Sequence, residues 1–172
     1  LNIEDEWILH EFNSVLLEVG EAWTNLDIYT ATQALKSFGT GILPSHYLEM
    51  VKSRLYDGDI NAAWTIHRIV RDFLSAFSPI CPFFSHHISS TIYGQSAVDV
   101  DSFPSNPLGK QYDENRNDYL RSKTNDIQSF NGEIWSNKKE NGISLNQPIS
   151  GVTIPENLKE FTEILTSMHS LE

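Results

Sequence analysis

The chain has 172 residues and a mass of 19.6 kDa, with 40% hydrophobic and 20% charged residues, so we expect one domain or one domain with a small appendage. No apolar segment approaches the 18 residues that a membrane-spanning helix needs, and the acidic start of the chain is unlike a signal peptide. The single cysteine, Cys81, excludes an internal disulfide framework and a cysteine zinc site, and it favours a reducing, cytoplasmic setting.

The two ends of the chain are expected to be cut. No initiating Met is present, and the first residues run directly into a helical pattern. Residues 171–172, Leu171-Glu172, are expected to be the remnant of a purification tag. The sequence is therefore expected to be a piece of a larger protein.

The net charge of −11 is unevenly distributed. Residues 1–60 carry ten acids and three bases, whereas residues 116–140 carry four acids and five bases. Proteins that bind nucleic acid usually carry a basic surface. Any contact with a polyanion is therefore expected to avoid the first third of the chain and to use the later helices.

The first half of the chain predicts four helices. Apolar residues recur at spacings of three and four from Ile8 to Leu26, and a second helix begins at a Thr30–Gln33 capping box. That second helix is expected to weaken or kink at Gly39, Gly41 and Pro44, and then to continue to Leu55.

Asp59 is expected to cap a third helix that ends at Ser78-Pro79. Pro82 opens a fourth helix, which ends at Gly94 and should bury Phe83, Phe84, Ile88 and Ile92. Short connections between helices with apolar stripes favour an antiparallel four-helix bundle over residues 1–94.

The second half predicts a connector and an appendage. Residues 95–112, with Pro104, Pro107 and Gly109, are expected to form an extended connector. Residues 113–170 should then form a helix, an extended pair and a last helix: Glu114 to Glu140, Ile143 to Ile154, and a segment opened by Pro155. The fold class is thus mainly α, with a small C-terminal α+β appendage.

Catalytic and metal-binding motifs are not evident. The sequence has no glycine-rich phosphate loop, and the adjacent His86 and His87 point about 100° apart on a helix, which disfavours a shared metal. We therefore predict no catalytic residue and no metal ligand. Most Trp and Phe residues lie on apolar stripes and are expected in the core, although Trp64 and Trp135 also neighbour basic residues.

Several segments together resemble a known family. Asp5-Glu6-Trp7-Ile8-Leu9, the stretch Tyr47 to Tyr56, and the turn Ser78-Pro79-Ile80-Cys81-Pro82-Phe83-Phe84 resemble the anticodon-binding helical domain of class I aminoacyl-tRNA synthetases. The turn is similar to the family's HP-x-x-PF pattern, with Ser78 in place of His. Phe130-Asn131 to Trp135, Lys138-Lys139, Gly142, Ser144-Leu145 and Pro148-Ile149 are similar to the C-terminal appendage of valyl-tRNA synthetases of the archaeal type. The matches cover most of residues 5–165.

The resemblance implies a non-catalytic fragment that binds a tRNA anticodon stem-loop. The family's catalytic signatures HIGH and KMSKS are absent, as is an upstream helix that carries part of the family's anticodon recognition. The second helix also departs from the family pattern, with Thr40, Gly41, Pro44 and Ser45 where an acid and a Trp are common. The implied parent attaches valine to its tRNA with ATP and magnesium, while the fragment itself needs no cofactor.

The implied partners are valine tRNA and the remainder of the synthetase chain, with no membrane and with a monomeric state. Splayed loop bases would offer stacking faces and hydrogen-bonding edges, while Lys and Arg would contact the phosphates. Arg68 and Arg71 are the first candidates, because acids are scarce around them. The full candidate set is Lys52, Arg54, Arg68, Arg71, Arg121, Lys123, Lys138 and Lys139. The alternative from another class is a helical protein-interaction module that keeps the bundle without binding RNA, which the negative charge favours.

Overall fold

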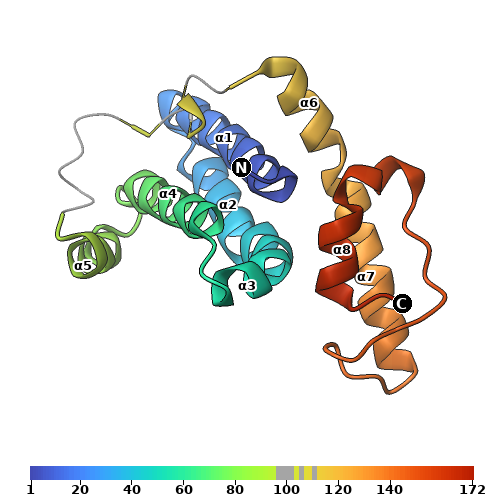
Figure 1. Cartoon of the computed structure of the whole chain (residues 1–172). Coiled ribbons are helices and arrows are strands. Elements are labelled where there is room, and N and C mark those ends of the chain that lie inside the picture. The colour runs from blue at the N-terminus through green and yellow to red at the C-terminus, as the bar shows by residue number, and fades with distance from the viewer. Residues whose placement is uncertain (96–102, 105–106, 110–111) are drawn as a thin grey trace.

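The protein is mainly helical, as the sequence predicts (Figure 1). The computed structural model describes residues 1–95, 103–104, 107–109 and 112–172. Most of the predicted connector at 95–112 lies outside the described residues. None of the helices in the described part combines the length and hydropathy that crossing a bilayer requires.

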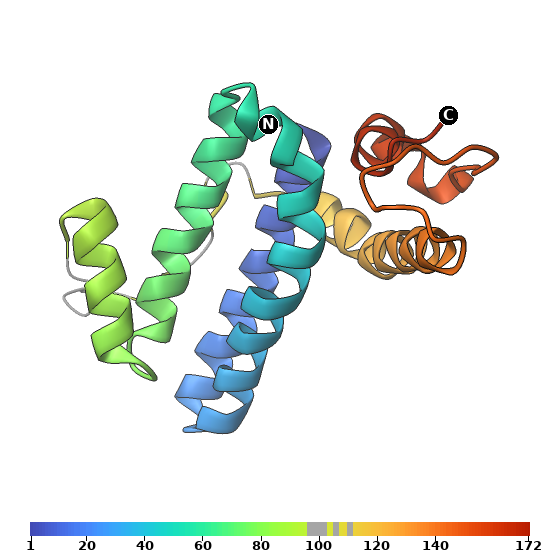
Figure 2. The same cartoon turned by 90° about the horizontal axis from the view of Figure 1, so that it is seen from below.

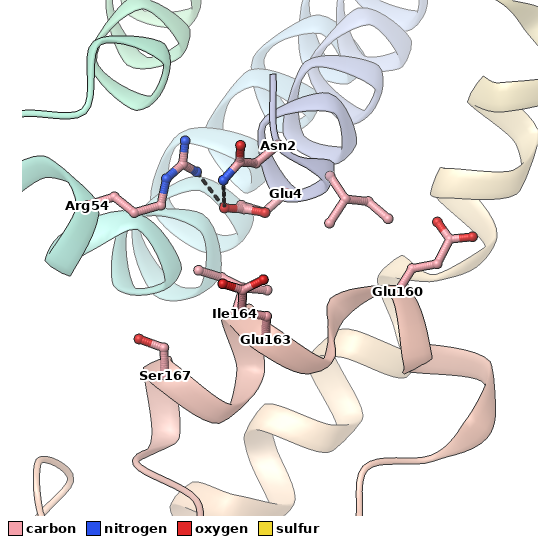
Figure 3. Close-up of a pocket in the computed structure, with 8 residues that line it drawn as sticks. Asn2, Glu4, Arg54, Glu160, Glu163, Ile164 and Ser167 are labelled. Atoms are coloured by element: carbon pink, nitrogen blue, oxygen red, sulfur yellow. Dashed lines mark hydrogen bonds and ion pairs between the residues drawn. The ribbon is translucent and has the colours of Figure 1, made fainter.

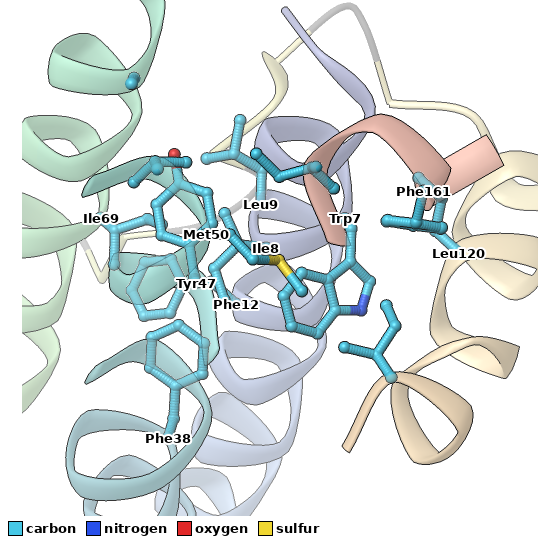
Figure 4. Packing of buried hydrophobic residues seen from close by; sticks show 14 of the residues in the cluster. Trp7, Ile8, Leu9, Phe12, Phe38, Tyr47, Met50, Ile69, Leu120 and Phe161 are labelled. Carbon is cyan, nitrogen blue, oxygen red and sulfur yellow. The ribbon is translucent and has the colours of Figure 1, made fainter. Parts of the chain in front are cut away.

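Helix α1, Ile3–Thr24, forms the centre of the core. The Asp5 carboxylate accepts a hydrogen bond from the Asn2 backbone N–H at 3.2 Å, which caps the first turn. Trp7, Ile8, Leu9 and Phe12 are completely buried, although the three successive positions 7–9 point about 100° apart and cannot share one face (Figure 4). They are all buried because α1 packs against α2 and α4 on one side and against α6 on another.

A second long helix runs without interruption from Ile28 to Tyr56 in three parts: α2 (Ile28–Ser37), the π-helix η1 (Phe38–Tyr47) and α3 (Leu48–Tyr56). The predicted kink is therefore a wider helical turn, which contains Pro44 without ending the helix. The predicted Thr30–Gln33 capping box is wrong. Asp27 is the N-cap, and its side chain accepts a hydrogen bond from the Thr30 N–H at 3.0 Å.

Helices α4 (Ile60–Phe77) and α5 (Pro82–Tyr93) complete the first part of the chain. The predicted cap is confirmed, because Asp59 accepts hydrogen bonds from the N–H groups of residues 61 and 62. In Figure 2, α1, the run from α2 to α3, and α4 lie side by side, and α5 lies beyond α4. Close packing of α4 on η1 depends on Gly39, where an added Cβ would lie 2.9 Å from Phe73 Cζ.

The predicted burial of α5 is wrong for its large apolar residues. Phe83 is 90% exposed, and Phe84 and Ile92 are more than half exposed. The residues of α5 that are buried are Ser85 and Ser89. The serines allow a close approach to α4, while Phe83 is exposed to solvent and the half-exposed Phe84 ring meets Phe77 of α4 edge-on at 6.4 Å.

The later part of the chain contains α6 (Glu114–Ser122) and α7 (Thr124–Glu140) in place of the single predicted helix. The break follows Lys123, next to the buried Thr124. The Thr124 hydroxyl accepts a hydrogen bond from Trp7 Nε1 at 2.9 Å and donates to Glu11 Oε1 at 2.5 Å. We attribute the break to this attachment of Thr124 to α1.

The predicted extended pair over residues 143–154 is not formed. The described residues contain no β-strand and only one isolated parallel bridge, between Ile149 and Leu171. Glu172, which the sequence assigns with Leu171 to a tag remnant, donates its N–H to the Ile149 carbonyl at 3.1 Å. Pro148 and Gly151 (φ +78°) flank Ile149 and prevent a longer ladder.

The chain ends with the 3₁₀-helix η3 (Glu156–Phe161) and helix α8 (Thr162–His169). Helix η3 packs against α1 and α7, and α8 packs against α3. Leu158, Phe161 and Leu165 are buried there and belong to the same apolar cluster as α1. The C-terminal unit is therefore joined to the first helices through one continuous core.

Candidate nucleic-acid interface

Arg54 lies inside a cluster of acids where three helices meet. Its guanidinium contacts Asp5 Oδ1 and Oδ2 at 3.0 and 2.8 Å and Asp59 Oδ2 at 2.9 Å, and it also pairs with Glu4. Asp5 and Glu4 are almost fully buried, and Tyr47 Oη donates to Asp5 at 2.7 Å. Arg54 therefore joins the start of α1, the end of α3 and the cap of α4.

The electrostatics of this cluster reflect its burial. Burial raises the pKa of Glu4, although the nearby guanidinium opposes that change. Burial also disfavours the charged form of Arg54, but hydrogen bonds to Asp5 and Asp59 keep the Arg54 pKa above its usual value. An adjacent cavity of about 340 Å³ is lined by Arg54 together with Glu4, Glu160 and Glu163 (Figure 3). A phosphate would meet carboxylates there, so this side of the Arg54 cluster is a poor RNA contact.

Lys138 is completely buried near the end of α7. Its ammonium donates hydrogen bonds to the carbonyls of Leu145, Gln147 and His169 at 2.8, 2.7 and 2.8 Å. Burial lowers the pKa of Lys138. Lys138 thus fastens the 145–147 turn to the end of α8 and has no surface to offer a phosphate. The adjacent Lys139 is exposed.

Arg68 and Arg71, the first candidates from the sequence, lie on the outer side of α4. Arg68 Nε contacts Asp72 Oδ2 at 2.9 Å, and burial raises the pKa of that Asp72 carboxyl. Arg71 is exposed and donates to Gln95 Oε1 at 3.0 Å. Of the two, Arg71 forms no ion pair in the described part of the chain, although its charge also acts on the Asp72 carboxyl.

Arg121 and Lys123 lie at the junction of α6 and α7. Arg121 is half exposed, with its Nε 3.9 Å from Glu11 Oε1. The Lys123 ammonium sits 4.8 Å from the centre of the Tyr119 ring, a favourable cation–π distance. Lys123 and Lys139 are separated by about 24 Å along α7 at the usual helical rise. The structure therefore distributes the predicted cations over several surfaces instead of gathering them into one patch.

Lys52 lies beside a polar groove between α3 and the end of α8, called here the α3–α8 groove. Its volume is about 330 Å³, and it is lined on one side by Lys52, Ser53 and Tyr56, and on the other by Asn146, Ser167 and Ser170. Lys52 Nζ is 3.5 Å from Glu49, which is exposed. Tyr56 is 82% exposed. Sequence reasoning missed this groove, because the wall that faces Tyr56 is formed by residues 90 to 114 positions further along the chain.

A chain of buried and half-buried polar groups connects η1 to the C-terminal unit. Asn131 of α7 contacts His46 Nδ1 at 3.0 Å through Nδ2 and His169 Nε2 at 2.8 Å through Oδ1. Burial lowers the pKa of His46, and burial together with Lys138 and His46 lowers the pKa of His169 to about 4. Trp135 packs against both imidazole rings, so it is not a free stacking surface.

The described residues show no evident metal centre. No group of three or more His, Cys, Asp or Glu side chains within that part of the chain could hold a metal ion. Lys36, which the sequence analysis did not select, is an exposed cation at the end of α2 beside an apolar groove. The candidate site is therefore a set of exposed cations spread over several helices.

Comparison with known proteins identifies the family. The family model described as the anticodon-binding domain of tRNA ligase matches residues 5–154. The valine–tRNA ligase of Saccharolobus solfataricus is 34% identical over 151 residues, which cover 87% of this chain and 17% of the relative. Those of Aeropyrum pernix and Sulfurisphaera tokodaii are 31% and 28% identical, over 87% and 73% of this chain and 19% and 16% of theirs.

The chain thus spans about a sixth of the length of these relatives. The family match extends from the beginning of α1 through α7 and beyond, so it includes both the first helices and most of the C-terminal unit. The chain belongs to the family of anticodon-binding domains of tRNA ligases.

Proposed function

We propose that this chain is the anticodon-binding domain of a valine–tRNA ligase and that it binds the anticodon stem-loop of valine tRNA. The observation that carries the proposal is the family match over residues 5–154, together with relatives named valine–tRNA ligase. This match favours RNA binding over the protein-interaction alternative. In this proposal valine, ATP and magnesium are handled by the rest of a cytoplasmic, monomeric parent enzyme, and the present chain only selects the tRNA.

The helices would act as a rigid support for the RNA. We propose that α1, the run from α2 to α3, α4 and α5 serve as a four-helix unit, and that the C-terminal unit, fixed by Thr124 and by the His46–Asn131–His169 chain, extends its surface. Rigid support matters because RNA loops are recognised through splayed bases, whose positions must match fixed side chains.

The accessible cations are the proposed phosphate contacts. Lys52, Arg71, Lys123 and Lys139 lie on the surface or at its edge, whereas Arg54 and Lys138 are engaged by carboxylates and carbonyls inside the protein. Arg68 and Arg121 are weaker candidates, because their acid partners Asp72 and Glu11 are largely buried, whereas Glu49 beside Lys52 is half exposed. Phosphate contacts would orient the RNA, and contacts with the bases would discriminate one anticodon from another.

The test is a titration of this chain with a valine tRNA transcript and with the same transcript carrying a different anticodon. We expect tighter binding to the valine anticodon, with an affinity that falls as salt rises. Equal affinity for both transcripts would contradict anticodon selection by this chain. The absence of binding even at low salt would contradict the proposal as a whole.

A further inference from the structure

We propose that the α3–α8 groove is a pocket for one unstacked nucleobase of the bound tRNA loop, with Tyr56 as its stacking surface. The inference rests on the proposed function, which it deepens by naming a site. The groove lies where the end of α3 faces the end of α8 and the 145–147 turn, at the boundary between the first helices and the C-terminal unit.

The groove has the chemical composition that a nucleobase requires. Its volume of about 330 Å³ lies in the lower range of small-molecule pockets, roughly 300–1,000 Å³. The thioethers of Met50 and Met168 supply an apolar part, and the hydroxyls of Ser53 and Ser167 with the amide of Asn146 supply donors and acceptors. In the described part of the chain, these three polar side chains make no hydrogen bond to another protein group, so their hydrogen-bonding capacity is available to a ligand.

Tyr56 is placed for stacking. Its ring is 82% exposed at the end of α3, and within the described residues it forms no ring contact with another aromatic side chain. Splayed bases of single-stranded RNA stack on exposed aromatic rings of this kind. Lys52, one helical turn before Tyr56, is placed to contact the phosphate of the same nucleotide.

Electrostatics distinguish this groove from the neighbouring cavity on α3. The cavity beside Arg54 presents Glu4, Glu160 and Glu163, whereas Glu49 is the one acid among the described residues that line the α3–α8 groove, and it pairs with Lys52. An anionic nucleotide would therefore enter the α3–α8 groove with less repulsion.

The wall of the groove is held by Lys138. Its three hydrogen bonds reach the carbonyls of Leu145 and Gln147, on either side of Asn146, and that of His169, which precedes Ser170. A buried ammonium thus fixes both segments that face α3. Lys138 contributes to RNA binding in this arrangement by shaping the pocket and not by contacting RNA.

The experiment compares dissociation constants of the 172-residue chain and its variants for a valine tRNA transcript. Tyr56→Ala should raise the dissociation constant between about five-fold and 150-fold, the usual range for losing one stacked base. Tyr56→Phe should bind almost as the parent chain does, because it retains the ring. Tyr29→Ala is the matched control, since Tyr29 is 74% exposed on α2 and far from the groove, and it should leave affinity unchanged.

Salt dependence separates the roles of the two groove residues. Lys52→Gln should weaken binding at low salt and reduce the slope of log affinity against log salt by about 0.7–0.9, the contribution of one phosphate contact. Tyr56→Ala should lower affinity with the slope unchanged. If the parent chain binds but Tyr56→Ala and Tyr29→Ala behave alike, the pocket is refuted while the proposed function stands. If the parent chain binds no tRNA, the proposed function itself fails, and the pocket with it.

Discussion

The substitution Arg54→Met separates a structural cation from an RNA-binding one. Arg54 neutralises Asp5 and Glu4, whose side chains are 0% and 3% exposed, and it also contacts the Asp59 cap of α4. Removing one partner of a buried ion pair leaves an uncompensated charge and costs about 3–5 kcal/mol. A domain of this size has a free energy of unfolding of about 5–15 kcal/mol, so the loss should be a large share of it.

Thermal or urea unfolding at pH 7 measures this loss. At about 2–4 °C for each kcal/mol, the melting temperature should fall by roughly 6–20 °C. The matched control is Lys52→Met on the same helix, which changes an exposed cation and should alter stability by less than about 0.5 kcal/mol. A loss below about 1 kcal/mol for Arg54→Met would refute the argument, because it would show that solvent screens the pair as it does at a surface.

Three further predictions concern the interior. Lys138→Met should lower the free energy of unfolding by about 2–4 kcal/mol, because it leaves three carbonyls unpaired, whereas Lys139→Met should change it by less than about 0.5 kcal/mol in the same denaturation assay. The pKa of His169 is about 4 in the folded chain and about 6.5 when unfolded, so the unfolded state binds the proton first as pH falls. His169 should therefore contribute about 3 kcal/mol of stability above pH 6.5 that is lost between pH 6.5 and pH 4, and a His169→Gln variant should show a flatter stability profile over that window. Gly39→Ala should destabilise by about 1–3 kcal/mol because its Cβ meets Phe73, and combining it with Phe73→Leu should recover part of the loss; equal stability of Gly39→Ala and the parent chain would show that the ring moves aside freely.

The helices were predictable from the sequence where capping and spacing agree. Asp59, Pro82 and Gly94 mark ends that the structure confirms, because each acts through its own backbone or through the next turn. Longer-range effects were not predictable. Thr124 ends one helix and begins another by bonding to α1, 113 residues away from Glu11 in the sequence. The burial of α5 was also predicted wrongly. Phe83 has apolar spacing, but it lies on the face opposite the buried Ser85 and Ser89.

Of the sequence features, charge was the least useful guide to which residues form the candidate site. In the sequence, Arg54 and Lys138 are cations near helix ends. That position is compatible with exposure to solvent or with contact to a phosphate. Their actual partners are two buried carboxylates near the start of the chain and three carbonyls beyond α7, and no local pattern brings these groups together. The α3–α8 groove depends on the same long-range packing. What the sequence did indicate correctly was the family, because its motifs extend over nearly the whole chain.

The salt dependence of tRNA binding follows from this distribution of cations. Arg54 and Lys138 are occupied within the protein, and Arg116 pairs with Glu6 at the surface. The proposed phosphate contacts are Lys52, Arg71, Lys123 and Lys139. If each neutralises one phosphate, log affinity should fall against log salt with a slope of about −2.8 to −3.6, and binding should weaken about 50- to 150-fold between 50 and 200 mM salt. A slope near −8 would require about nine to eleven phosphate contacts, more than twice the four proposed here, and it would contradict this assignment of the contacts. A shallow slope with retained selectivity for the valine anticodon would mean that stacking and base edges supply most of the binding energy, as expected for an acidic protein that recognises a splayed RNA loop.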